Sequence, residues 1–338
     1  MSAMSDFPLP VVWTVPFGAE CFMWDPPLLR DDAVIVRAGS RVVAVARRDG
    51  STRWSVDLKS VNRGGDVLGE VGDVVFVDSR RADRTTELVG VRKDGAAWRS
   101  PLEGQLLRHG ATVVDDAIVA VVVTGTRNQA DLVHVDGATG SSRRVRLAAS
   151  GATIVADGPR VVISSPTARE GSPGAWVPDR SGKVERVLRT GDVWLGAIAS
   201  ARLLTIGSRD GDLFSLDVRD VATGNVEWSD MCFTSAAAFD DREAAYVRKA
   251  ASSSELVLRD AATGAIRWRT DLGDVEPGSI TFAGPLVFVR HMIGLVLLRR
   301  DDGHVLGDVV DSFSFGGAFA DGMLFLGNDT RLVAARLR

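Results

Sequence analysis

The sequence contains few of the residues that cross-link a chain or bind metals. Only two of its 338 residues are cysteine, Cys21 and Cys232, and they form neither an adjacent pair nor a CxxC motif. This argues against a disulfide-stapled secreted scaffold and against a cysteine-based zinc site. The four histidines are dispersed along the chain and lack the spacing of a metal site. No Ser nucleophile elbow, phosphate-binding loop or dinucleotide fingerprint is present.

Long apolar runs and a strong charge of one sign are also missing. The N-terminal residues lack the basic and apolar regions of a signal peptide, so we expect a cytoplasmic protein. No apolar run approaches the ~20 residues of a membrane-spanning helix. The net charge of -4 gives no reason to expect a nucleic acid or an anionic membrane as partner. We expect a monomer.

Helical periodicity is the third absence. Apolar residues alternate or occur in short Val-rich blocks, as at 34–36, 74–77 and 286–289, and turns rich in Gly or Asp bound these blocks. The pattern predicts an all-β protein.

What the sequence does have is an internal repeat. An apolar strand leads into a turn with Asp and Gly, and a second strand then carries Trp or Arg about four residues after the Gly. The turn glycines are Gly50, Gly95, Gly140, Gly182, Gly224, Gly264 and Gly303. Their successive spacings of 45, 45, 42, 42, 40 and 39 residues match the period of a four-stranded propeller blade. Glycine suits such a turn because the backbone needs a positive φ there.

The spacing asks for an eighth unit, divided between the two ends of the chain. Residues 11–17 resemble the second half of the motif, and residues 323–338 resemble inner strands that lack an outer one. If Trp13 takes the Trp position, its missing Gly falls at residue 9, and the two steps around the ring are 44 and 41 residues. We therefore predict a single domain over 1–338, an eight-bladed propeller of four-stranded antiparallel blades with 11–17 as closing strand. Seven blades are the alternative.

The best copies of the motif are Ala261-Ala262-Thr263-Gly264 with Trp268, and Ala222-Thr223-Gly224 with Trp228. They resemble the repeat of the pyrroloquinoline-quinone-type propellers, which include quinoprotein dehydrogenases and a non-enzymatic lipoprotein of outer-membrane barrel assembly. The resemblance implies that a Trp of each blade docks against the next blade. The residues so assigned are Trp13, Trp54, Trp98, Trp228 and Trp268. Arg144, Arg186 and Gly307 stand at the Trp position in other blades, where we expect weaker contacts.

The resemblance also bears on cofactors. Enzymatic members of the family hold the quinone over a vicinal disulfide and a calcium ion. This chain has no adjacent cysteines and no matching set of calcium ligands. We predict no cofactor, and a quinone-dependent dehydrogenase is the least favoured function.

Residues that do not follow the repeat mark a candidate site. They fall in the connections that lead from one blade to the next, which a propeller gathers around one mouth of its central channel. Aromatic walls with a few polar groups are typical of ligand sites. The candidates are Glu20, Phe22, Trp24, Asp25, Arg63, Arg108, His109, Trp194, Asp230, Phe233, Glu276 and Phe313.

Each candidate also has a structural interpretation. The aromatic side chains could simply plug the channel, and a lone histidine such as His109 is more often structural than a general base. On the functional side, Glu20 and Asp25 could form a carboxylate pair with Glu276 for acid–base work. Buried free thiols are the default interpretation of the two cysteines.

Three functions remain open at this point. The first is a binding scaffold that recognises a protein or peptide through one face. The second is an enzyme or sensor that binds a small molecule at the channel mouth. The third is the quinone-dependent dehydrogenase.

Overall fold

The computed structural model describes most of the chain, and every regular element in the described residues is a strand. No helix capable of crossing a membrane is found among these residues. The described residues are 8–17, 26–59, 67–80, 85–124, 129–150, 153–157, 160–165, 174–178, 184–188, 193–209, 213–233, 236–249, 253–291, 294–309, 313–328 and 330–337.

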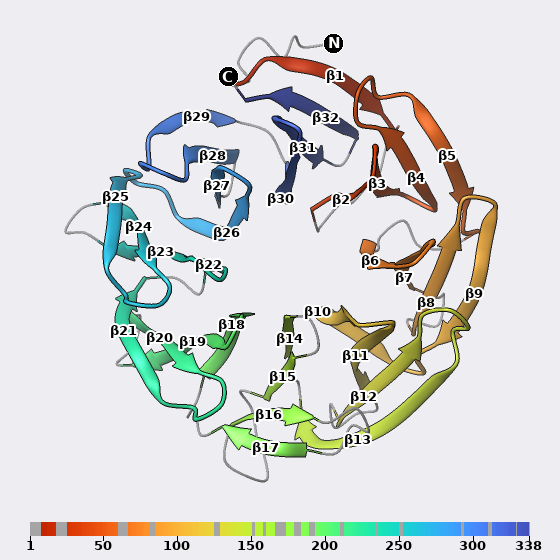
Figure 1. Ribbon diagram of the computed structural model, residues 1–338, viewed down its shortest axis with the longest axis horizontal. Coiled ribbons are helices and arrows are strands. Elements are labelled where there is room, and N and C mark those ends of the chain that lie inside the picture. Colours follow the sequence, from red (N-terminus) through yellow and green to blue (C-terminus); the bar gives the residue numbers. More distant parts are fainter. Residues whose placement is uncertain are drawn as a thin grey trace.

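The described strands form eight four-stranded antiparallel sheets arranged as the blades of a ring (Figure 1). In seven of them the strands follow one another along the chain, from the innermost to the outermost. The eighth has the order β1-β32-β31-β30, so its outer strand comes from the beginning of the chain. The sheets correspond one to one to the eight units predicted from the turn spacing.

The blades are numbered along the chain. Blade 1 contains β2 (Leu28–Arg30), β3 (Ala33–Ala38), β4 (Arg41–Ala46) and β5 (Thr52–Asp57), and blade 2 contains β6 (Val67–Val71), β7 (Val74–Arg80), β8 (Thr86–Arg92) and β9 (Gly95–Pro101). Blade 3 contains β10 (Gln105–Val114), β11 (Ala117–Thr124), β12 (Gln129–Asp136) and β13 (Ser142–Ser150), and blade 4 contains β14 (Thr153–Asp157), β15 (Arg160–Ser165), β16 (Gly174–Pro178) and β17 (Val184–Leu188). Blade 5 contains β18 (Val193–Ala199), β19 (Arg202–Arg209), β20 (Leu213–Asp220) and β21 (Val226–Cys232), and blade 6 contains β22 (Ala237–Phe239), β23 (Glu243–Lys249), β24 (Ser254–Asp260) and β25 (Ile266–Asp271). Blade 7 contains β26 (Pro277–Ala283), β27 (Leu286–His291), β28 (Gly294–Arg299) and β29 (Val305–Val309), and blade 8 contains β30 (Phe313–Ala320), β31 (Met323–Asn328), β32 (Arg331–Arg336) and β1 (Val11–Pro16).

The hydrophobic core is divided into layers between blades. Eight clusters of buried apolar residues occur in the described part of the chain, one at each contact between neighbouring blades. One of them joins blade 8 to blade 1 through Phe325, Leu332, Val36 and Val43. Burial is thus continuous around the ring, because each sheet covers the face of the next.

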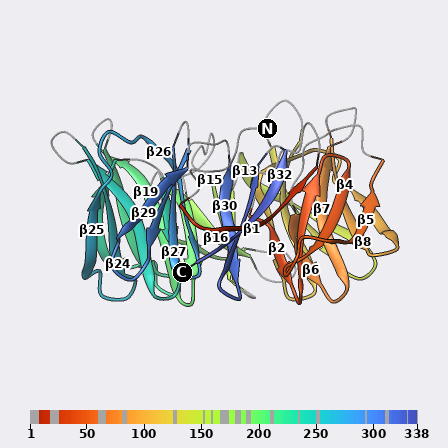
Figure 2. The ribbon, with the colours of Figure 1, turned by 90° about the horizontal axis from the view of Figure 1, so that it is seen from above.

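The ring has two different ends (Figure 2). We call the hairpin end the one that carries the turns between the first and second strands and between the third and fourth strands of each blade. We call the connection end the one that carries the links from one blade to the next, together with the turns between second and third strands.

The turn before each outer strand explains the Asp and Gly of the repeat. In blade 6, Asp260 accepts hydrogen bonds from the Thr263 backbone N–H and hydroxyl, both at 2.8 Å. Gly264 has a φ of 69°, and the corresponding glycines at 50, 140, 224 and 303 have φ between 71° and 75°. The predicted reason for glycine in this turn is therefore confirmed. Gly182 lies outside the described residues.

The two ends of the chain rebuild this turn without a covalent link. In blade 6 the Asp260 N–H donates to Ala265 and the Ala261 N–H donates to Arg242. In blade 8 the Arg336 N–H donates to Pro10 at 2.9 Å, and the Leu337 N–H donates to Gly322 at 3.0 Å. The same pair of bonds recurs in both blades, which places the start of β1 where a turn would deliver it.

Candidate interaction surface

The tryptophans of the repeat join each blade to the next. The indole N–H of Trp13, Trp98, Trp228 and Trp268 donates to a carbonyl in the following blade's outer turn, at 2.8 to 3.0 Å. The acceptors are Arg47, Gly137, Ala261 and Arg300. A Cβ added to the turn glycine would meet the Trp ring, at 2.5 Å for Gly140 and 2.7 Å for Gly264. Glycine is thus required both by φ and by the packed ring.

Trp54 docks differently from the other four. It packs on the apolar cluster shared by blades 1 and 2. The next turn is shorter there, because Arg92 pairs directly with Gly95. No Cβ contact would arise at Gly95. The prediction that these tryptophans lie between blades is confirmed, and the shorter turn accounts for the different contact of Trp54.

A β-bulge sets the direction of the Trp side chain. The third and fourth strands change register beside the Trp position in seven blades, for example between Leu258 and Arg259, which pair with Trp268 and Ile266. In blade 3 the shift lies elsewhere, between Gln129 and Asp131. Arg144 therefore contacts the preceding blade instead of the following one. It donates to the Leu102 carbonyl of blade 2 and forms an ion pair with Asp131 of its own blade. Since a bulge re-aims side chains, its position decides which neighbour is contacted.

Gly307 is the Trp position of blade 7, and the N-terminal segment fills the space beside it. A Cβ on Gly307 would lie 2.5 Å from the Cβ of Pro8. Leu9 is 6% exposed and belongs to the cluster between blades 7 and 8. The weak contact predicted for Gly307 is therefore supplemented by a segment far away in the sequence. The side chain of Arg186 lies outside the described residues.

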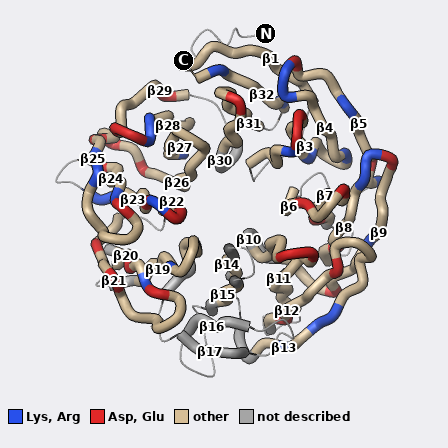
Figure 3. The backbone as a smooth tube through the Cα atoms, viewed as in Figure 1, with Lys and Arg blue, Asp and Glu red and all other residues tan. Residues whose placement is uncertain are grey.

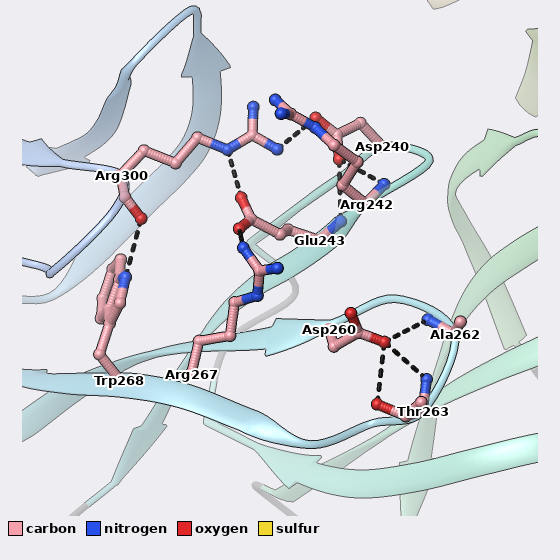
Figure 4. Close-up of polar contacts among 9 residues, drawn as sticks. All are labelled: Asp240, Arg242, Glu243, Asp260, Ala262, Thr263, Arg267, Trp268 and Arg300. Carbon is pink, nitrogen blue, oxygen red and sulfur yellow. Dashed lines mark hydrogen bonds and ion pairs between the residues drawn. The ribbon is translucent and has the colours of Figure 1, made fainter.

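Buried charges reinforce the contact of blades 6 and 7 (Figure 4). Arg300 and Glu243 are 7% and 3% exposed, and they form an ion pair. Asp240 pairs with Arg300, and Arg267 pairs with Glu243. These residues are paired with each other and serve the joint between the blades.

Asp230, a predicted channel-mouth residue, lies in a similar joint. It is on the outer strand β21 and accepts hydrogen bonds from the Tyr246 hydroxyl and the Arg259 guanidinium of blade 6. Burial opposes the charged form of Asp230, yet these donors and the Met231 N–H hold the pKa of its carboxyl below the usual value. Its place in the structure is an interblade ion pair on an outer strand.

Acidic residues gather at the inner turns of the hairpin end (Figure 3). Asp31, Asp115 and Asp321 have positive φ, a conformation that Asp adopts more readily than most residues. Asp73 pairs with Arg92 at 3.0 Å, and Asp321 pairs with Arg47 of blade 1 at 3.0 Å. Backbone geometry and ion pairs thus account for acidic side chains at this end.

The structure describes the backbone or the side chain of six other predicted residues. Arg108 and His109 are on the innermost strand β10, Trp194 is on β18, and Phe313 is on β30. Trp194 and Phe313 stand at the start of their strands, which is the connection end, whereas Arg108 and His109 are the fourth and fifth residues of the ten-residue β10. The side chains of these four residues lie outside the described part. Phe233 follows β21, with the Lys249 amine 4.7 Å from its ring centre, and Glu276 is exposed before β26. Outside the described residues lie Glu20, Phe22, Trp24, Asp25 and Arg63.

Sequence reasoning missed a feature of the innermost strands. Five of them change register near the connection end, at Val67/Gly69, Leu106/Ala111, Leu195/Ala197, Pro277/Ser279 and Phe313/Gly317. A glycine stands within or beside each shift, and the recurrence of Gly69, Gly110, Gly196, Gly278 and Gly317 along the sequence is the signal that could have revealed it. Bulges bend a strand locally, so the channel wall is irregular at this end.

The chemistry available among the described residues is limited. They contain no cluster of three or more His, Cys, Asp or Glu side chains placed to hold a metal ion. Burial raises the pKa of the Cys232 thiol to about 12, which disfavours the nucleophilic thiolate. His291 Nε2 lies 3.1 Å from Asp308 Oδ1, with His291 9% exposed. This pair spans β27 and β29 within one blade.

Comparison with known proteins identifies the fold. No family model matches the chain. BamB from Moraxella catarrhalis is similar over 97% of this chain and 100% of its own, with a TM-score of 0.61 and 15% identity. A quinohemoprotein alcohol dehydrogenase from Pseudomonas putida HK5 is similar over 98% of this chain and 76% of its own (TM-score 0.63, 13% identity). The C-terminal WD40 domain of Sif2 is similar over 98% of this chain and 99% of its own, with a TM-score of 0.68 and 11% identity.

A curated sequence relative adds little. Cobyric acid synthase from Sphingopyxis alaskensis is 32% identical over 128 residues, which cover 29% of this chain and 26% of the enzyme. The chain therefore spans about a quarter of that relative. The structural similarities establish a β-propeller whose neighbours include propellers of the pyrroloquinoline-quinone type.

Proposed function

We propose that this protein is a binding scaffold that recognises a protein or peptide partner through the connection end of the ring. The observation that supports this most is the difference between the two ends. At the hairpin end, repeated turns and ion pairs tie the side chains of several blades to the fold. Phe233 and Glu276, which depart from the repeat, lie at the connection end, where the innermost strands that carry Trp194 and Phe313 also begin.

Similarity to other propellers supports the general class of function. BamB and the WD40 domain of Sif2 are propellers of protein-interaction type. Eight similar blades present eight unlike connections at one end, and such a composite surface suits an extended partner more than a single small substrate.

Two described residues, Phe233 and Glu276, allow the proposal to be tested first. Phe233 is an aromatic side chain that is only partly buried, with a cation 4.7 Å from its ring. Glu276 is exposed in the connection that follows blade 6. Aromatic residues ringed by polar groups are typical of interface hot spots.

The test places a photo-crosslinking amino acid at either end of the ring. Probes at Phe233 and Glu276 are expected to capture the same protein from native extract. Matched probes at Asp116 and Thr263, on exposed turns of the hairpin end, should capture it at least about tenfold less. The captured protein is then purified and its affinity for the wild type and for Phe233→Ala is measured. A loss of about tenfold corresponds to about 1.4 kcal/mol. Equal capture from both ends would contradict the proposal.

A small molecule at the channel mouth is the second candidate. It is favoured by the placement of Arg108, His109, Trp194 and Phe313 on innermost strands, with Trp194 and Phe313 at the start of theirs. A metabolite panel is screened for a rise in Tm of the wild type that His109→Ala and Trp194→Ala abolish. If no compound raises Tm, this alternative fails while the scaffold proposal is unaffected.

A further inference from the structure

The segment 8–17 has the properties of a bound peptide. It pairs with β32 from Val11 opposite Ala335 to Pro16 opposite Arg331. The Phe17 N–H donates to Thr330 at 2.8 Å, and Pro10 accepts from Arg336 at 2.9 Å. All these partners lie more than 300 positions away in the sequence.

The ring offers three sockets for this segment. Gly307 of blade 7 leaves room for Pro8. The cluster of blades 7 and 8 takes up Leu9. Gly50 and the Arg47 carbonyl of blade 1 receive the Trp13 ring and its N–H, the latter at 2.9 Å. The segment therefore contacts three blades, numbers 7, 8 and 1.

We propose that these sockets accept residues 8–17 of a second copy of this chain, giving a dimer by exchange of β1. The occupant is fixed by the sockets, which fit a proline, a leucine and, four residues after the leucine, a tryptophan. Every contact made within one chain is available unchanged between two chains, so exchange costs little beyond association itself.

Concentration decides between the two forms. A strand tethered by a short connection has an effective concentration of roughly millimolar. At a chain concentration of about 10 µM, the exchanged form should then be roughly 1% of the total, and near 1 mM it should approach half.

The experiment uses two full-length single-cysteine proteins in a Cys21→Ser, Cys232→Ser background. One carries Pro16→Cys and the other Arg331→Cys, positions that lie directly opposite on β1 and β32. The two are mixed, unfolded, refolded at about 10 µM or about 1 mM, and oxidised. A disulfide-linked heterodimer is expected, increasing at least about tenfold at the higher concentration.

Two controls make a negative result decisive. Both substitutions in one chain should give an intramolecular disulfide, which shows that the geometry allows the bond. Arg41→Cys and Asp57→Cys, opposite each other inside the continuous blade 1, should give no concentration-dependent heterodimer when divided between two chains. Absence of the Pro16–Arg331 heterodimer, with both controls as stated and both proteins refolded, would overturn the proposal.

Discussion

At the scale of single residues, a Trp and a Gly from neighbouring blades form the joint that the sequence repeats. Trp268 is 9% exposed, its N–H donates to Arg300 at 2.8 Å, and its ring lies against Gly303. The pair explains why both residue types recur at fixed spacing.

Substitution of Trp268 separates the two contributions of the indole. Trp268→Phe keeps most of the apolar contact but leaves the Arg300 carbonyl without this donor, and we expect a loss of about 1–3 kcal/mol in the free energy of unfolding. Trp268→Ala also leaves a cavity and should cost about 3–5 kcal/mol. Denaturant unfolding measures both values. Equal losses for the two variants would contradict the assignment of the hydrogen bond.

Tyr246 makes stability sensitive to high pH. Burial, followed by its hydrogen bond to Asp230, raises the pKa of the Tyr246 hydroxyl above the usual 10.0, and burial raises the pKa of Cys232 from 9.0 to about 12. Both folded pKa values exceed the unfolded ones, so the stabilisation is complete below pH ~9 and is lost as pH rises towards 12.

The Tyr246→Phe variant tests this origin. It should be less stable than the wild type at pH 7, because Asp230 and Arg259 lose a shared partner. Its stability should also fall less steeply between pH 10 and 12. Urea midpoints at several pH values measure the slope, and an unchanged slope would assign the alkaline loss to other groups.

At the scale of elements, the bulge in the outer strand matters as much as the residue beside it. Blade 3 lacks the bulge at the Trp position, and Arg144 contacts the preceding blade. Blade 7 has the bulge but carries Gly307, and Pro8 occupies the space. The repeat pattern alone would treat both positions as worn copies of the same joint.

Restoring the repeat at Gly307 should therefore destabilise the protein. The Trp of Gly307→Trp would compete with Pro8 for the same space, and overpacking costs about 1–3 kcal/mol. In a chain that lacks residues 1–8, Gly307→Trp should cost less stability than in the full chain, because Pro8 is then absent. The comparison protein is the same truncated chain with Gly307 intact. A higher Tm for Gly307→Trp in the full chain would show that Pro8 yields easily.

At the scale of the whole molecule, the ring is closed by hydrogen bonds and packing where the other blades have a covalent turn. The first and last strands, β1 and β32, lie side by side (Figure 1), and the Arg336 N–H and the Pro10 carbonyl oxygen are 2.9 Å apart. A circular permutant is the natural test of this closure.

The permutant joins residue 338 to residue 8 through a short Gly-Ser linker and opens the chain between residues 20 and 21. We expect it to fold with a circular dichroism spectrum like that of the wild type, because all eight blades are then continuous. Its refolded dimer fraction should no longer rise with concentration. Failure to fold would show that the order of the blades along the chain matters beyond their contacts.

Much of the architecture follows from local sequence, because a turn with a positive φ needs Gly and a half-buried strand needs alternation. The candidate site follows less well. In the sequence, Asp230 stands among residues that do not follow the repeat, which predicts that it lines the channel mouth. In the structure its carboxylate accepts hydrogen bonds from Tyr246 and Arg259 of the next blade. Such pairing across blades depends on which face of a strand a residue takes, and a bulge reverses that assignment.

The sequence by itself therefore determined the all-β class, the blade period and the closure by residues 11–17, since spacing and turn chemistry are properties of short segments. Only the tertiary structure decided how each joint is made. Pro8 packs beside Gly307, and Arg144 binds Leu102 of the preceding blade. Both contacts arise because packing between sheets brings together residues that are distant in the chain, and no local sequence pattern specifies which residues meet.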